Sequence, residues 1–167
     1  YDAIVIGVGG MGSAAVYHLA KRGLKVLGLE QFEIPHELGS SHGHSRMIRY
    51  TLQEHPSYVP LVRRAYELWH ELEQSARETL VVTTGSVRAG PPDSDFYLGA
   101  IEACDMHQIP YEILGNTEVN KRFPGYQFPD GISSVYQADG GFLLPELCIT
   151  SHSQVAEEPG AEIHSGE

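Results

Sequence analysis

The sequence predicts an α/β protein in which a parallel sheet is interrupted by a smaller, mainly antiparallel α+β insertion. Three observations support this fold class. Residues 2–29 show strand, helix and strand patterns in turn, residues 81–139 mix short strands with helices, and residues 145–164 return to a helix and a strand. We therefore expect a first domain over residues 1–80 and 140–167 and an inserted domain over residues 81–139, both incomplete.

The first thirty residues form a complete strand–helix–strand unit. Asp2 to Gly7 is a short apolar run of the kind that a buried parallel strand needs. Residues 13–22 carry apolar side chains at helical spacing, and Gly23 follows where a helix C-cap belongs. Residues 25–29 form the second expected strand, with Glu30 at its end.

The turn between the first strand and the helix, residues 7–12, has the pattern G-x-G-x-x-G. Gly7 allows the tight turn, Gly9 lets backbone approach a pyrophosphate, and Gly12 lets the helix pack closely on the strand. The helix N-terminus attracts that pyrophosphate, and Glu30 can accept hydrogen bonds from ribose hydroxyls. Together these parts predict dinucleotide binding rather than a structural turn. Glu30 disfavours the 2′-phosphate of NADP, while FAD and NAD both remain open.

The segment after this unit predicts a loop and then a long helix. Residues 39–45 are rich in glycine, serine and histidine, and residues 46–52 fit either a helical turn or a strand. Ser57 is expected to cap an amphipathic helix that places Trp69 in the core. Leu61, Ala65, Leu68 and Leu72 are spaced along one face of this helix.

Short strands and helices alternate in the inserted domain. Strands are expected at residues 81–82, 86–89, 111–114 and 133–137, and helices at 93–107 and from a cap at Thr117. Pro145 then begins a helix over residues 145–158, and residues 161–164 form a strand that returns to the parallel sheet.

Composition excludes several classes of protein. The net charge of −11 disfavours nucleic acid and anionic membranes as partners, and no apolar run or signal peptide indicates membrane targeting. Cys104 and Cys148 are far apart and are expected to be small buried hydrophobic residues, which fits a cytoplasmic protein. Because a core strand begins beside Tyr1 and another ends beside Glu167, we expect the chain to be part of a longer protein.

One segment has the opposite charge to the rest of the chain. Residues 38–53 contain no Asp or Glu but hold Arg46, Arg49, His42 and His44. Such a local positive field indicates a nearby anion, either cofactor phosphates, a reduced flavin or a substrate carboxylate, and a solvated basic turn is the alternative. The two histidines have no third ligand nearby, so we expect no metal site.

Residues 39–49, Gly-Ser-Ser-His-Gly-His-Ser-Arg-Met-Ile-Arg, resemble the G-S-x-H-G-x-[ST]-R-x-I-R segment of the monomeric sarcosine oxidase family. N-methyltryptophan oxidase and pipecolate oxidase are relatives in that family. Weaker similarities extend the resemblance over essentially the whole chain, at residues 58–61, 68–69, 84–85, 120–125 and 140–143. The family comprises FAD-containing amine oxidases with a D-amino-acid-oxidase-like fold. The resemblance therefore implies FAD, a Rossmann-like FAD-binding domain over residues 1–80 and 140–167, and a substrate domain over residues 81–139.

The resemblance also implies roles for single residues. Arg46 would lie against the isoalloxazine ring, where a fixed cation stabilises the reduced flavin. Arg49 would bind the substrate carboxylate with its guanidinium fork. His42 joins the two arginines in the implied catalytic set. The residues implied to contact FAD are Gly7, Val8, Gly9, Gly10, Met11, Gly12, Glu30, Gln31, Ser41, His42, Ser45, Arg46 and Met47.

The implied activity is oxidation of a secondary amino acid such as sarcosine to an imine, with hydrogen peroxide formed from oxygen. The expected partners are the small amino acid and oxygen, with no nucleic acid or membrane, and the full-length protein is expected to be monomeric. Two alternatives remain open: an FAD dehydrogenase of the same fold that passes electrons to a carrier, and a fragment without catalytic activity. His44 departs from the family, whose bacterial members often have aspartate there. The family attaches its flavin to a downstream cysteine that neither Cys104 nor Cys148 matches.

Overall fold

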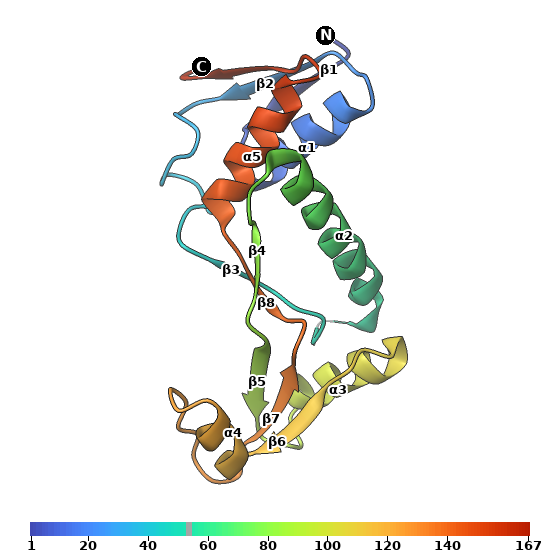
Figure 1. Ribbon diagram of the computed structural model, residues 1–167, viewed down its shortest axis with the longest axis vertical. Helices are drawn as coiled ribbons and strands as arrows, with labels where there is room; N and C mark the ends of the chain where they lie inside the picture. The colour runs from blue at the N-terminus through green and yellow to red at the C-terminus, as the bar shows by residue number, and fades with distance from the viewer. Residues whose placement is uncertain (53–54) are drawn as a thin grey trace. The chain divides into compact units, whose positions relative to one another are not determined.

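The computed structural model describes residues 1–52 and 55–167 (Figure 1). Gln53, the last residue of the basic segment, lies outside the described residues. The chain divides into two compact units. Unit 1 comprises Tyr1–Arg46, Leu68–Val82 and Leu143–Glu167, and unit 2 comprises Met47–Glu67 and Thr83–Phe142. The main difference from the expected boundaries is the segment 47–67, which clusters with unit 2.

A three-stranded parallel sheet organises unit 1. Its strand order is β1 (Ala3–Ile6), β2 (Val26–Glu30) and β9 (Glu162–Ser165), so the last strand does return to the sheet as predicted. Helix α1 (Gly10–Lys21) makes the crossover from β1 to β2, which parallel strands require. It begins at Gly10, three residues before the predicted start, so Gly12 of the motif belongs to its first turn. Gly23 has a φ of +82° after the helix, as expected of its C-cap position.

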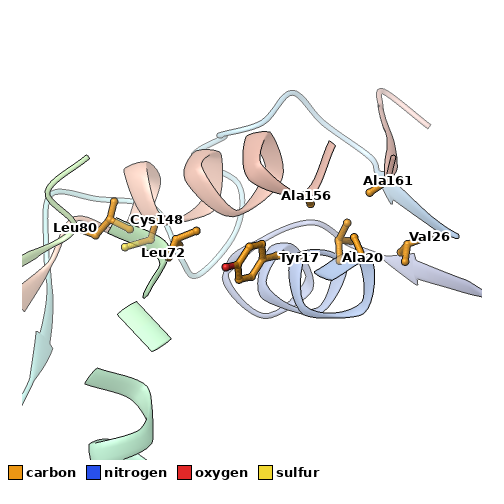
Figure 2. Close-up of a cluster of buried hydrophobic side chains, with 9 residues drawn as sticks. Tyr17, Ala20, Val26, Leu72, Leu80, Cys148, Ala156 and Ala161 are labelled. Atoms are coloured by element: carbon orange, nitrogen blue, oxygen red, sulfur yellow. The ribbon is translucent and has the colours of Figure 1, made fainter. Parts of the chain in front are cut away.

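The core of unit 1 lies between α1 and α5 (Pro145–Glu157), and Figure 2 shows its side chains. The buried residues come from α1, α2 (Val59–Ala76), α5 and segments in or beside the strands. They are Val16, Tyr17, Ala20, Val26, Leu72, Leu80, Cys148, Ala156 and Ala161. Cys148 and Cys104 are both buried, free thiols, as predicted. On β1, by contrast, Ile4 and Ile6 are 58% and 87% exposed. Within the described residues the sheet is therefore packed on one face only.

Unit 2 contains the predicted antiparallel sheet. Its order is β5 (Ser86–Gly90), β7 (Ser133–Gln137) and β6 (Glu112–Gly115), with β7 antiparallel to both neighbours. Helix α3 (Asp95–His107) contacts β5 and β7, and the hydroxyl of Ser94 caps it by accepting a hydrogen bond from the N–H of Tyr97. Helix α4 (Asn116–Arg122) begins after Gly115, so the predicted cap at Thr117 is wrong.

Three short strands form a further sheet, and the sequence predicted only the one at residues 81–82. The structure has the sheet order β3 (Arg46–Ile48), β8 (Gly141–Leu143) and β4 (Val81–Thr83). The ambiguous segment 46–52 thus begins as a strand. Strand β8 was not predicted, because three residues carry no periodic pattern of their own. No helix in the described part of the chain is long and apolar enough to cross a bilayer.

The long helix α2 (Val59–Ala76) follows a single 3-10 turn, η1 (Pro56–Tyr58). The ring of His55 caps this turn by accepting a hydrogen bond from the N–H of Ser57 at 3.2 Å. The predicted cap at Ser57 is therefore wrong, because that residue already lies inside the turn and its N–H is the group being capped.

Candidate dinucleotide site

The three motif glycines of the glycine-rich turn, Gly7, Gly9 and Gly12, are needed for different reasons. Gly7 has a φ of +87° and donates its N–H to the carbonyl of Leu29 at 2.7 Å. A Cβ atom at Gly12 would lie 1.7 Å from the carbonyl oxygen of Gly7, so only glycine fits there. A Cβ at Gly9 would meet no protein atom within 4 Å. Gly7 and Gly12 are thus required by the turn itself, whereas Gly9 leaves open space beside the backbone.

A pocket of about 330 Å³ opens beside this turn. Its walls include the predicted cofactor residues of the turn, Gly7 to Gly12, together with Glu30, Ser41 and His42. The remaining lining residues are Ile34, Pro35, His36, Gly39, Ser40 and Ile149. Gln31, Ser45, Arg46 and Met47, which were also predicted to contact the cofactor, do not line this pocket. The structure therefore brings the residues that were predicted to bind the pyrophosphate and the ribose together in one cavity.

Glu30 is almost fully buried at the end of β2, with 6% of its surface exposed. Its Oε2 accepts a hydrogen bond from the N–H of Val8 at 2.7 Å, and its Oε1 accepts one from the N–H of Phe32 at 3.3 Å. Burial by itself raises the pKa of Glu30. The backbone donors and nearby His36 lower it by more than burial raises it, so the pKa of Glu30 lies below its usual value. The side chain is therefore a charged acceptor at neutral pH.

His36 was not predicted, yet it contacts that carboxylate directly. Its Nε2 lies 3.3 Å from Oε1 of Glu30, and its Nδ1 accepts a hydrogen bond from the N–H of Leu38 at 3.1 Å. Because Nδ1 is an acceptor, a neutral His36 ring carries its proton on Nε2. This N–H group faces Oε1 of Glu30. A histidine six residues after an acid, in an irregular loop, has no sequence pattern that would have revealed this contact.

Arg46 is exposed, but its guanidinium is held by the backbone of its own loop. It donates hydrogen bonds to the carbonyl oxygens of Ser45 at 2.8 Å, Ser40 at 2.6 Å and His42 at 2.7 Å. The same loop is tied to α5, because the N–H of Gly43 donates to Oε1 of Glu146 at 2.8 Å. The positive charge of Arg46 is therefore fixed in place by the fold of residues 40–46.

A second pocket, of about 370 Å³, shares Gly10, Met11, Ser40, Ser41 and Ile149 with the first. It is also lined by Arg46, Trp69 and His152. Trp69 was expected in the core and away from the cofactor groove. The structure corrects this: Trp69 is half-buried, packs against the core with one side and faces this neighbouring pocket with the other. One residue of α2 can thus contact both the core and the pocket.

His152 is a buried titratable group that also lines this pocket. It is 4% exposed, its ring centre lies 5.2 Å from that of Trp69, and its Nδ1 has no hydrogen-bond partner within the described residues. Burial, helped by the neighbouring His18, lowers the pKa of His152 to about 4. The ring is therefore neutral at physiological pH.

Arg49 and Met47 belong to unit 2. Arg49 is half-buried, and its Nε donates a hydrogen bond to the carbonyl of Thr51 at 3.3 Å. Its guanidinium also contacts the sulfur of Met47. A planar guanidinium of this kind can bind a carboxylate through two parallel hydrogen bonds. The predicted substrate role of Arg49, and a groove shared with Gly7, Glu30 and Arg46, remain predictions.

Known proteins similar to this chain are longer than it is. A monomeric sarcosine oxidase of Streptomyces avermitilis is 43% identical over 164 residues, which are 98% of this chain and 43% of that protein. An N-methyl-L-tryptophan oxidase of Salmonella arizonae is 41% identical over 160 residues, covering 96% of this chain and 43% of that protein. The chain thus spans less than half the length of the curated relatives it matches.

Solved structures agree with the fold. NikD, described as an unusual amino acid oxidase essential for nikkomycin biosynthesis, superimposes with a TM-score of 0.88 at 27% identity, over 99% of this chain and 43% of NikD. An L-proline dehydrogenase from P. horikoshii superimposes with a TM-score of 0.83 at 23% identity, over 99% of this chain and 44% of that protein, which shows a common fold. The family model described as FAD dependent oxidoreductase matches residues 2–167. The chain therefore belongs to the FAD dependent oxidoreductase family, as the resemblance at residues 39–49 had indicated.

Proposed function

We propose that the protein containing this chain is an oxidase of secondary amino acids such as sarcosine, which uses FAD and forms hydrogen peroxide from oxygen. The observation that carries the proposal is the pocket of the glycine turn and Glu30, in a chain that resembles sarcosine and N-methyl-L-tryptophan oxidases over nearly all of its length. The proposed partners are accordingly a small amino acid and oxygen.

The residues of the pocket fit the proposed cofactor. The open side of Gly9 and the first-turn N–H groups of α1 suit a pyrophosphate, which a helix N-terminus attracts. The buried carboxylate of Glu30 retains lone pairs for ribose hydroxyls, because only one short hydrogen bond occupies Oε2. When bound, FAD supplies the group that takes up two electrons from the amine and passes them to oxygen.

Arg46 and Arg49 would have different roles in the reaction. Arg46 would hold a fixed positive charge where negative charge develops during electron transfer, and its three carbonyl contacts keep it preorganised for that task. Arg49 would bind and align the substrate carboxylate. In the net reaction the amine loses two electrons and two protons to become an imine, which water hydrolyses, while oxygen gains both to become hydrogen peroxide.

The decisive experiment is a peroxide assay of the purified full-length protein against a panel of primary, N-methyl and cyclic amino acids. We expect a yellow protein with an oxidised-flavin spectrum that forms peroxide with one or more secondary amino acids. A colourless, folded protein that binds NAD would contradict the FAD assignment. Slow reoxidation by oxygen, with fast turnover on an artificial electron acceptor, would instead identify a dehydrogenase.

A further inference from the structure

The peptide group between His42 and Gly43 is held at both ends by charged side chains. Its carbonyl oxygen accepts a hydrogen bond from Nη2 of Arg46 at 2.7 Å, and its N–H donates to Oε1 of Glu146 at 2.8 Å. In a trans peptide these two groups point in opposite directions. One peptide therefore links a carboxylate on α5 to the guanidinium in the loop.

This arrangement strengthens the hydrogen bond between the His42 carbonyl and Arg46 in two ways. Hydrogen bonds that involve an ionised partner are about twice as strong as neutral ones, and both bonds of this peptide are of that kind. A carboxylate at the N–H also polarises the peptide and makes its carbonyl a better acceptor for the guanidinium. The negative charge of Glu146 is thus felt at Arg46 without direct contact.

The two ends of this link differ in how firmly they are anchored. Glu146 lies in the first turn of α5, directly after Pro145, and α5 packs on α1 in the core of unit 1. Gly43 lies in an irregular loop with a φ of +110°, a backbone conformation that residues with side chains rarely adopt. Glu146 is therefore anchored by α5, and its hydrogen bond to Gly43 holds the conformation of the loop.

We propose that Glu146 is a positioning residue for Arg46, which it orients through the His42–Gly43 peptide. This inference rests on the proposed function for the role of Arg46 at the flavin. Without the carboxylate the peptide is free to rotate, and Arg46 retains only the carbonyl oxygens of Ser40 and Ser45. The fixed cation then becomes a mobile one.

The first test measures amide hydrogen exchange of the full-length apoprotein in Glu146→Ala and Glu146→Gln variants. Peptides covering residues 40–46 should exchange at least tenfold faster in Glu146→Ala and by a smaller factor in Glu146→Gln, because the amide side chain retains a weaker, neutral acceptor. Glu157→Gln, at the exposed far end of the same helix, is the matched control and should leave the loop unchanged. Unchanged exchange of the loop in Glu146→Ala would overturn the proposal.

The second test asks whether Glu146 acts through Arg46. In the FAD-loaded protein, Glu146→Gln should move the flavin midpoint potential to more negative values, and this shift should vanish when Arg46→Lys is already present. Equal shifts in both backgrounds would show that Glu146 acts independently of Arg46 and would overturn the inference. Loop exchange is read without substrate or cofactor, so a protein that passes both tests yet forms no peroxide would refute the proposed function and leave the positioning role intact.

Discussion

Glu30 shows how the fold alone can fix the position and the charge of one buried side chain. Its carboxylate is buried, yet backbone N–H groups and His36 keep its pKa below the usual value. The cost of placing a charge in the protein is therefore offset by hydrogen bonds that also fix the direction of both oxygens. A ribose hydroxyl would meet an acceptor that needs no reorientation.

Replacing Glu30 by glutamine should weaken FAD binding by about 1–3 kcal/mol, the usual penalty for losing a charge-assisted hydrogen bond. Titrating the apoprotein with FAD, and following the loss of flavin fluorescence, measures this change directly. Glu33→Gln is a suitable control, because Glu33 is exposed and does not line the pocket of the glycine turn. Equal FAD affinity in the Glu30 variant and the control would show that Glu30 does not hold the ribose.

His152 makes the stability of the folded protein depend on pH. The unfolded chain binds a proton at this residue near pH 6.5, but the folded chain does so only near pH 4, because burial lowers the pKa of His152. Between these values the unfolded state holds more protons, so stability falls as the pH is lowered. The free energy of unfolding should therefore lose about 2 kcal/mol between pH 7.5 and pH 5 through this one group.

Urea unfolding followed by circular dichroism at pH 7.5 and pH 5 tests this prediction. The loss of stability between the two pH values should be about 2 kcal/mol smaller in His152→Gln than in the unmodified protein. His164→Gln, which removes an exposed histidine of β9, controls for the loss of one imidazole. An unchanged pH dependence in His152→Gln would mean that His152 is protonated in the folded state as readily as in the unfolded one.

At the scale of elements, the glycine turn separates what the fold needs from what the cofactor needs. Gly12→Ala places a Cβ atom 1.7 Å from the carbonyl of Gly7 and should destabilise the protein by about 1–3 kcal/mol or more. Gly9→Ala meets no protein atom within 4 Å and should leave stability unchanged, but it should weaken FAD binding, because the new methyl group occupies the space of the pyrophosphate.

Thermal unfolding and FAD titration of the two apoproteins distinguish these effects. The two variants are matched, since each adds one methyl group to the same turn. If Gly9→Ala bound FAD as tightly as the unmodified protein, the pyrophosphate would not approach the backbone at that residue, and the assignment of the pocket would have to be revised.

Local patterns explain which elements could be predicted. The β1–α1–β2 unit is continuous in sequence, so its apolar runs, its glycines and Gly23 all indicate the same structure. Strand β8 is only three residues long and exists because of its pairing within a sheet. The cap at His55 also escaped prediction, because Ser57 is the commoner N-cap residue and the ring of histidine has no such preference.

In the site, too, residues specified by a local sequence pattern could be predicted, and residues brought in by distant contacts could not. Residues 7–12 and Glu30 were predictable because one motif specifies them, and they do line one pocket. His36, Ile149 and Glu146 were not, since their contacts depend on a loop conformation or on a helix more than a hundred residues away. The basic segment 38–53 was recognised as a unit by its charge, yet the structure divides its two arginines between units 1 and 2.

The different contacts of Arg46 and Arg49 predict separable effects of the two arginines in the full-length protein. Arg46→Lys keeps the charge but cannot reproduce the three carbonyl contacts, so it should chiefly slow flavin reduction or reoxidation and change the flavin spectrum. Removing a preorganised charge altogether lowers the rate by about a hundred- to a thousand-fold, which is the upper limit for Arg46→Lys, because lysine keeps the charge but not its fixed position. Arg49→Lys loses the planar fork, so it should chiefly weaken binding of the substrate and of unreactive carboxylate analogues.

Anaerobic flavin reduction as a function of substrate concentration, together with titration by an unreactive carboxylate, measures both quantities for both variants. Each arginine serves as the control for the other, because the two substitutions are chemically identical and lie three residues apart. The expected pattern is a changed limiting rate in Arg46→Lys and a changed dissociation constant in Arg49→Lys. If both variants showed the same modest loss in both measurements, the two arginines would provide only a diffuse positive field, and their separate roles would have to be abandoned.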